Sequence, residues 1–157
     1  YQPTDIVADP LNCALYVNCS TGTTRFGEHK LECPYPKLYD ISSRTCKNFD
    51  EVECNGRKIP MTPCEYQQNV CLKGDVSCKP CPERLPSCAG LPNGVHADPR
   101  APWSNSYIRC FNNRTLVVEQ CTSGYFNTRT RQCEVYVNSG QTFHIFDFLY
   151  CAYFSLI

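Results

Sequence analysis

The chain has 157 residues, of which 14 are cysteine, and its 15 basic side chains balance 15 acidic ones. This cysteine content is typical of a disulfide scaffold in an oxidising compartment, so we expect a secreted protein of the extracellular matrix. The zero net charge argues against nucleic acid or an anionic membrane as the main partner, and it suits a neutral ligand.

The first 54 residues predict a small β module. Residues 14–17 favour a strand, and residues 37–41 favour a second strand that ends in the polar turn 42–45. Helical periodicity is nearly absent. Modules of about 50 residues bury too little surface to fold on hydrophobicity alone, so we expect disulfides to supply the difference. The cysteines of this segment are Cys13, Cys19, Cys33, Cys46 and Cys54.

Residues 55–87 differ in composition, because they combine five prolines with Cys64, Cys71, Cys78 and Cys81. We interpret them as a crosslinked linker between two modules. The Cys78-Lys79-Pro80-Cys81 spacing also suits zinc, but no second pair completes four ligands, so we favour disulfides and expect no metal or cofactor. Two tripeptides of this segment, Lys73-Gly74-Asp75 and Asn55-Gly56-Arg57, match adhesion sequences, although matches this short arise by chance.

Residues 88–133 predict a second β module. Residues 106–109 and 115–119 favour a hairpin across Asn112-Asn113-Arg114, and residues 124–127 repeat the pattern of 37–41. The remaining residues, 134–157, form an unassigned tail with an apolar end. That end is only 15 residues long and contains His144 and Asp147, so it is short for a membrane span. The predicted fold class is therefore a small, disulfide-rich, mainly β protein with two hairpin modules and a Cys/Pro-rich linker.

A family resemblance rests on two phrases of the first module. Asp9-Pro10, Cys13, Tyr16 and Cys19 reproduce the phrase Asp-Pro-x-x-Cys-x-x-Tyr-x-x-Cys, and Cys33-Pro34 precedes Tyr39-Asp40 and Cys46 as in the family's second phrase. The chain thus resembles the peritrophin-A family, the invertebrate type 2 chitin-binding domain. It departs from that family in two ways. The first cysteine would lie before Tyr1, and Asn48 and Phe49 stand where the family has a tryptophan.

The resemblance implies a disulfide pattern of first to third, second to sixth and fourth to fifth cysteine. In this sequence it implies the pairs Cys13–Cys54, Cys33–Cys46, Cys88–Cys110 and Cys121–Cys133. In the second copy Ser104 replaces the second cysteine and no sixth follows, so that bridge is absent. A two-bridge copy of this kind is similar to those of molluscan shell-matrix proteins. The pairing of the other cysteines stays open: Cys19, Cys64, Cys71, Cys78, Cys81 and Cys151.

The resemblance also implies chitin, or a related N-acetylglucosamine polymer, as the partner; other matrix proteins are a further candidate. The sugar rings of chitin have apolar faces and polar edges. Exposed aromatic rings on a disulfide-crosslinked hairpin would therefore bind them. The candidate carbohydrate-binding residues are Tyr39, Asp40, Phe49, Trp103, Tyr125, Phe126 and Asn127. For Tyr39 and Phe126 a place in the small core is an equal alternative, and Asp40 and Asn127 could simply close turns.

Catalytic motifs are absent, including the acidic phrase of family 18 chitinases, a Gly-x-Ser-x-Gly elbow and a His-Glu-x-x-His site, so we do not expect an enzyme. Asn113 begins a glycosylation sequon. Two alternatives remain. One is a serine protease inhibitor that presents Lys58-Ile59 or Arg84-Leu85, and the other is a structural spacer without sugar affinity.

Overall fold

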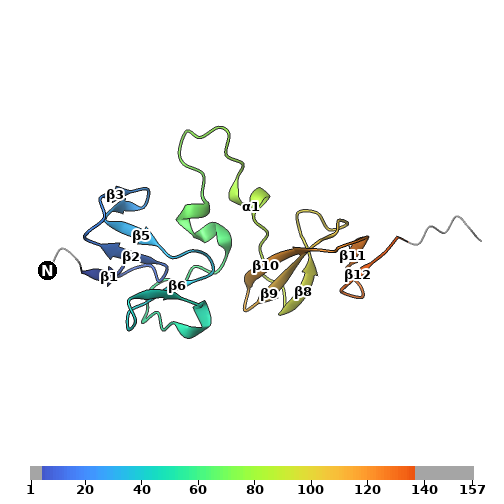
Figure 1. Cartoon of the computed structure of the whole chain (residues 1–157), viewed down its shortest axis with the longest axis horizontal. Coiled ribbons are helices and arrows are strands. Elements are labelled where there is room, and N and C mark those ends of the chain that lie inside the picture. Colours follow the sequence, from blue (N-terminus) through green and yellow to red (C-terminus); the bar gives the residue numbers. More distant parts are fainter. Residues whose placement is uncertain (1–4, 137–157) are drawn as a thin grey trace, which may run out of the picture.

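Two small β modules lie side by side along the long axis of the molecule, and the computed structural model describes residues 5–136 (Figure 1). The prediction of a disulfide-rich β fold is confirmed. The first module contains a three-stranded antiparallel sheet in the order β1-β2-β5 and two hairpins. Its elements are β1 Ile6–Ala8, β2 Leu15–Asn18, β3 Thr23–Thr24, β4 Gly27–Glu28, β5 Lys30–Glu32, β6 Leu38–Asp40, β7 Thr45–Lys47 and the 3-10 turn η1 Phe49–Glu51.

The second module repeats this plan with a sheet in the order β10-β9-β8 and one hairpin, β11-β12. Its strands are β8 Gly94–Ala97, β9 Ser106–Phe111, β10 Arg114–Gln120, β11 Tyr125–Asn127 and β12 Gln132–Glu134. Asn112 and Asn113 connect β9 to β10 with φ values of 48° and 60°. Two successive positive φ angles are what a two-residue hairpin turn of type I′ requires, and asparagine tolerates them.

Six disulfides crosslink the described residues. Four of them join the pairs that the family resemblance implied: Cys13–Cys54, Cys33–Cys46, Cys88–Cys110 and Cys121–Cys133. The other two, Cys64–Cys81 and Cys71–Cys78, lie between the modules. Cys78 and Cys81 therefore belong to two different bridges, and their sulfurs are not available to zinc. Cys19 is free within residues 5–136, and Cys151 lies outside that range.

Equivalent contacts relate the two modules. The amide of Tyr39 donates to the carbonyl of Cys13 at 2.8 Å, and the amide of Phe126 donates to that of Ser104 at 3.1 Å. Ser104 thus takes the place of Cys13. Each hairpin ring also stacks on a ring from the sheet. Tyr16 and Tyr39 have centroids 4.8 Å apart, and those of Tyr107 and Phe126 are 5.0 Å apart.

The segment between the modules does more than space them. Its helical turns are η2 Pro63–Glu65, η3 Gln67–Asn69 and α1 Cys81–Arg84. Tyr66 is fully buried in the core of the first module with Leu38 and the Cys13–Cys54 bridge. Its hydroxyl donates to the carbonyl of Lys37 at 2.9 Å. Residues that the composition predicted to be a linker therefore complete the first core.

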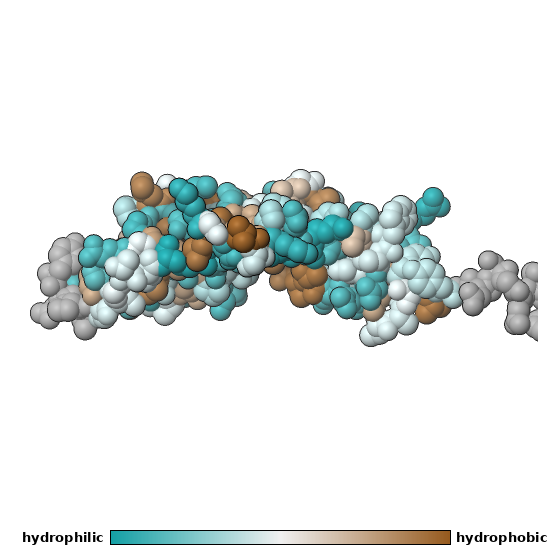
Figure 2. Space-filling model, turned by 90° about the horizontal axis from the view of Figure 1, so that it is seen from above, coloured by the Kyte–Doolittle hydropathy of each residue, from teal (hydrophilic) through white to brown (hydrophobic). Residues whose placement is uncertain are grey.

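A direct contact joins the second module to the first. Arg114, at the start of β10, is 1% exposed, and its guanidinium lies over the ring of Phe49 at 4.5 Å. The next residue, Thr115, donates its amide to the Tyr35 hydroxyl at 2.8 Å. Figure 2 shows the apolar surface of one face as separate patches rather than one continuous band. None of the helices in residues 5–136 has the length and apolar character to cross a membrane.

Candidate functional site

The hairpin between the fourth and fifth cysteines of each module turns one ring inward. Tyr39 is 1% exposed and Phe126 is 2% exposed. Both occupy the middle position of a three-residue strand, and both stack on a sheet tyrosine beneath them. Because a ring with no accessible face cannot stack on a sugar, these two residues serve as core. Of the two roles that the sequence left open for them, their burial favours the core.

Asp40 is also tied into the first hairpin. Its carboxylate accepts hydrogen bonds from the Ser43 amide at 3.0 Å and the Ser43 hydroxyl at 2.6 Å, and it pairs with Lys47 at 2.8 Å. The hydrogen bond from Lys47, followed by those from Ser43, lowers the pKa of Asp40 well below its ordinary range. The side chain closes the turn and has little left to offer a ligand.

Phe49 lies at the junction of the modules rather than on an open face. Its ring is half-buried beneath the guanidinium of Arg114, and it contacts the ring of Phe111 at a centroid distance of 6.2 Å. The three candidates of the first module are thus engaged in packing or turn closure. None of them presents a free ring.

In the second module the same hairpin is more open. Tyr125 takes the place that Leu38 fills in the first module, since each is the first residue of its strand. Leu38 is 1% exposed, whereas Tyr125 is half-buried. Asn127 follows two positions later on the same side of the strand, and its side-chain oxygen accepts the amide of Arg129 at 2.8 Å.

Glu134 organises this open hairpin from the opposite strand, where the register places it across from Tyr125. Its carboxylate accepts hydrogen bonds from the Tyr125 hydroxyl at 3.1 Å, the Asn127 side-chain amide Nδ2 at 2.7 Å and the Thr130 hydroxyl at 2.7 Å. These three hydrogen bonds lower the pKa of Glu134, and the one from Asn127 has the largest effect. Sequence reasoning missed Glu134 because it follows the last cysteine of the module.

Trp103 completes an aromatic hollow against this hairpin. The hollow measures about 340 Å³ and is lined by Trp103, Tyr125, Phe126, Asn127, Thr128 and Arg129. Trp103 is 81% exposed, and the bond between Phe126 and the carbonyl of Ser104 brings its loop to the hairpin. Tyr136 extends the aromatic surface, since its ring is 71% exposed and lies 5.0 Å from that of Tyr125. The sequence offered no motif for Tyr136.

The loop that carries Trp103 is held by Asp98. This carboxylate is 1% exposed and accepts hydrogen bonds from the Arg100 amide at 2.9 Å and the Ser106 hydroxyl at 3.1 Å. The side-chain bond from Arg100 is the main cause of the lowered pKa of Asp98. Asp98-Pro99 repeats Asp9-Pro10, so the repeat itself was a signal that could have found this residue.

The two positions considered for protease inhibition are engaged in the fold. Lys58 donates its backbone amide to Leu11 and accepts the amide of Cys13, each at 2.8 Å. The Arg84 side chain donates to the carbonyl of Lys79 at 2.8 Å, and the Leu85 amide donates to Cys81 within the last turn of α1. An inhibitory loop offers its backbone and its basic side chain to the protease, whereas here the Lys58 backbone and the Arg84 side chain are bound within the fold, which disfavours the inhibitor alternative.

Two further expectations concern glycosylation and metal binding. Asn113 is exposed in the β9–β10 turn, and its glycosylation stays a prediction. Within residues 5–136, no cluster of three or more His, Cys, Asp or Glu side chains could hold a metal ion.

Comparison with known families gives a match that occurs twice along the chain. The family model described as the chitin binding Peritrophin-A domain matches residues 1–54 and again residues 88–141, together more than half of the chain. The second match extends beyond Cys133. No curated protein matches the sequence.

Proposed function

Because this chain belongs to the peritrophin-A family of chitin-binding domains, we propose that it holds chitin without catalysis in an extracellular matrix, through aromatic stacking on its second module. The observation that carries this assignment is the hollow between Trp103 and Tyr125. It combines an exposed indole with a half-buried phenol on a disulfide-stapled hairpin.

The chemistry of the hollow suits the polymer. The pyranose faces of chitin carry axial C–H groups, which pack on the faces of aromatic rings, while its hydroxyl and acetamide edges need polar partners. Trp103 and Tyr125 supply rings, and Asn127 and Arg129 supply polar groups beside them. A neutral ligand needs no charge complement, in agreement with the zero net charge of the chain.

The two modules differ in what they offer. Among the described aromatic residues, those with exposed rings are Trp103, Phe111 and Tyr136, and all three lie within the second family match, residues 88–141. In the first module the position equivalent to Tyr125 is occupied by Leu38, which is buried. We therefore assign the principal sugar contact to the second module, while the first module and its attached segment stabilise the arrangement.

Binding isotherms on chitin beads test this proposal. Trp103→Ala and Tyr125→Ala should each weaken binding about tenfold, equivalent to about 1.4 kcal/mol, because each removes one stacking ring. Trp103→Phe should retain most of the affinity. Leu11→Ala is the matched control, since Leu11 is an apolar side chain of the first module that is 77% exposed.

The opposite results are informative as well. Unchanged affinity in both Trp103→Ala and Tyr125→Ala, with normal disulfides, would reject the aromatic hollow as the sugar site. Absence of chitin binding by the unmodified chain would favour the structural-spacer alternative.

A further inference from the structure

An exposed loop between the modules is closed by its own disulfide. Cys71 and Cys78 form a bridge, and all six residues between them are exposed. This loop precedes α1 and rises away from both modules (Figure 1). Val76 is 100% exposed and Leu72 is 58% exposed, so the loop contributes nothing to either core. None of its residues lines the aromatic hollow.

A tight turn forms the tip of this loop. The Asp75 amide donates to the carbonyl of Leu72 at 3.1 Å, and Gly74 has a φ of +89°. A β-turn with positive φ at its third position favours glycine there, because other side chains are strained in that region. Lys73 and Asp75 therefore flank the glycine at fixed positions of the turn.

The two charged side chains of the tip are available to a partner. Asp75 Oδ1 accepts the Ser77 amide at 3.0 Å and the Ser77 hydroxyl at 2.7 Å, which orient the exposed carboxylate. The side-chain bond from Ser77 is the main cause of the lowered pKa of Asp75, so the carboxylate is ionised at neutral pH. Within residues 5–136, the Lys73 ammonium has no hydrogen bond or ion pair.

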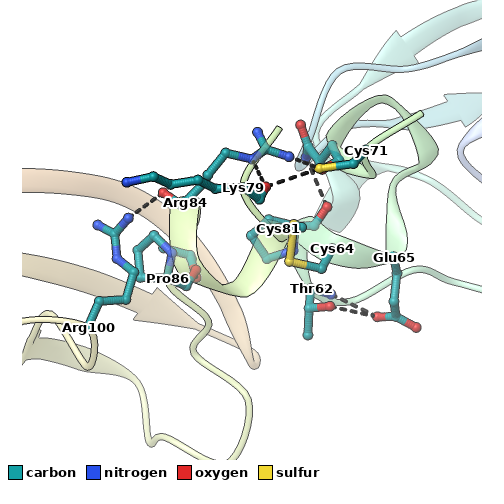
Figure 3. The surroundings of a disulfide bond; sticks show 12 residues. Thr62, Cys64, Glu65, Cys71, Lys79, Cys81, Arg84, Pro86 and Arg100 are labelled. Carbon is teal, nitrogen blue, oxygen red and sulfur yellow. Dashed lines mark hydrogen bonds between the residues drawn. A yellow bond between two sulfur atoms is a disulfide. The ribbon is translucent and has the colours of Figure 1, made fainter. Parts of the chain in front are cut away.

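Hydrogen bonds and a disulfide hold the base of the loop on both sides. On one side, Arg25 of the first module donates to the carbonyls of Gln67, Gln68 and Val70. On the other side, Arg84 donates to Lys79 and also reaches back to the carbonyl of Asn69, as Figure 3 shows in part. The Cys64–Cys81 bridge fixes α1 beneath it. A turn presented on such a base loses little entropy when it binds.

We propose that this loop docks its Lys73-Gly74-Asp75 tip into a cell-surface adhesion receptor that reads a basic residue, glycine and aspartate through a bound divalent cation. The Asp75 carboxylate is a hard oxygen ligand that would complete the coordination of the receptor's cation. The Lys73 ammonium would pair with an acidic pocket of the receptor, and Leu72 and Val76 would supply the apolar contacts around this pair. The interaction goes beyond chitin binding, because it would connect the polymer to a cell.

The test uses the full chain with its disulfides intact, fixed to a biosensor surface without chitin. The probes are purified receptor ectodomains that bind Arg-Gly-Asp peptides, applied in Mn²⁺ or in a chelator. We expect saturable binding in Mn²⁺ that the chelator abolishes and that a linear Arg-Gly-Asp peptide competes away. Asp75→Asn should lower the affinity at least tenfold, and Lys73→Arg should preserve it. Asp50→Asn is the control, because Asp50 is an exposed carboxylate of the first module.

Three results would overturn the proposal: no ectodomain binds in Mn²⁺, binding persists in the chelator, or Asp75→Asn binds as well as Asp50→Asn. Retention on chitin beads is measured for every variant as a check on folding. Absence of receptor binding by the unmodified chain, with normal chitin retention, counts against the receptor proposal alone. Loss of chitin retention by the unmodified chain counts against the proposed sugar site.

Discussion

Arg114 provides the sharpest test of how the two modules are joined. The residue belongs to the second module, but its guanidinium lies 4.5 Å from the ring centroid of Phe49 in the first. Its Nη2 lies 3.6 Å from the sulfur of Met61. With an exposed fraction of 1%, the side chain is effectively withdrawn from solvent. We predict that Arg114→Ala destabilises the junction and separates the unfolding of the modules.

The expected change in the free energy of unfolding for Arg114→Ala combines two losses of stability and one gain. A desolvated cation–π contact contributes about 2 kcal/mol. The three methylenes of the stem add about 2 kcal/mol at roughly 0.8 kcal/mol each. In the other direction, Nη1 of Arg114 is buried without a hydrogen-bond partner among the described residues, and removing such a donor regains about 1–3 kcal/mol. The net destabilisation should therefore be about 2 kcal/mol.

Urea unfolding with disulfides intact measures this effect. The unmodified chain should unfold in one transition, and Arg114→Ala should show an earlier, broader or split transition as the modules uncouple. Arg114→Met keeps most of the stem and removes the unpaired donor, so its cost should stay below about 1 kcal/mol. Arg109→Ala is the control, because Arg109 is 52% exposed and pairs with Glu119 at 3.3 Å on the surface. Equal effects of Arg114→Ala and Arg109→Ala would refute the reasoning.

Three further predictions concern the cores, the acid response and the ligand. Tyr39→Phe should leave stability unchanged or raise it, because the Tyr39 hydroxyl is buried without a hydrogen-bond partner in residues 5–136 and Phe126 fills the same place in the second module; a lower urea midpoint would contradict this. Asp98 has a lowered pKa in the fold, so its contribution is present above its unfolded pKa of about 3.9 and is lost as the pH falls through the folded value. Asp98→Asn should therefore lower the urea midpoint at pH 7 and make the midpoint fall less steeply below about pH 4. If the urea midpoint depends on pH in the same way in both proteins, this role of Asp98 is wrong. Chitin retention should be nearly equal at about 0.1 M and 1 M salt, because screening weakens only exposed charge interactions; elution by salt would indicate a charged partner.

Local sequence signals were sufficient for the architecture. Cysteine spacing, β-type runs and the Asn112-Asn113 turn are short-range features, and each restricts the backbone where it stands. They predicted the two β modules. The four implied disulfides, which the structure contains, came from the family resemblance, since spacing alone leaves the connectivity of cysteines open.

The candidate site was less predictable because alternation along a strand defines two faces but not which of them is buried. Tyr39 and Tyr125 stand in similar phrases, yet Tyr39 is the second residue of β6 and is buried, whereas Tyr125 is the first residue of β11 and is half-buried. The equivalent first residue of β6, Leu38, is buried, so position in the strand does not decide exposure. Glu134 and Tyr136 lie beyond the last recognisable cysteine, and only the β11–β12 register brings Glu134 opposite Tyr125.

The sequence by itself determined that this chain is a pair of stapled β modules of a sugar-binding family, because cysteines and turn residues act locally. The tertiary structure decided which aromatic rings are free, how residues 55–87 complete the first core, and that Arg114 joins the modules. Each of these depends on contacts between residues far apart in the chain, such as the 53 positions that separate Met61 from Arg114. No local pattern specifies such contacts, since the free energy that selects them comes from burial in the assembled fold.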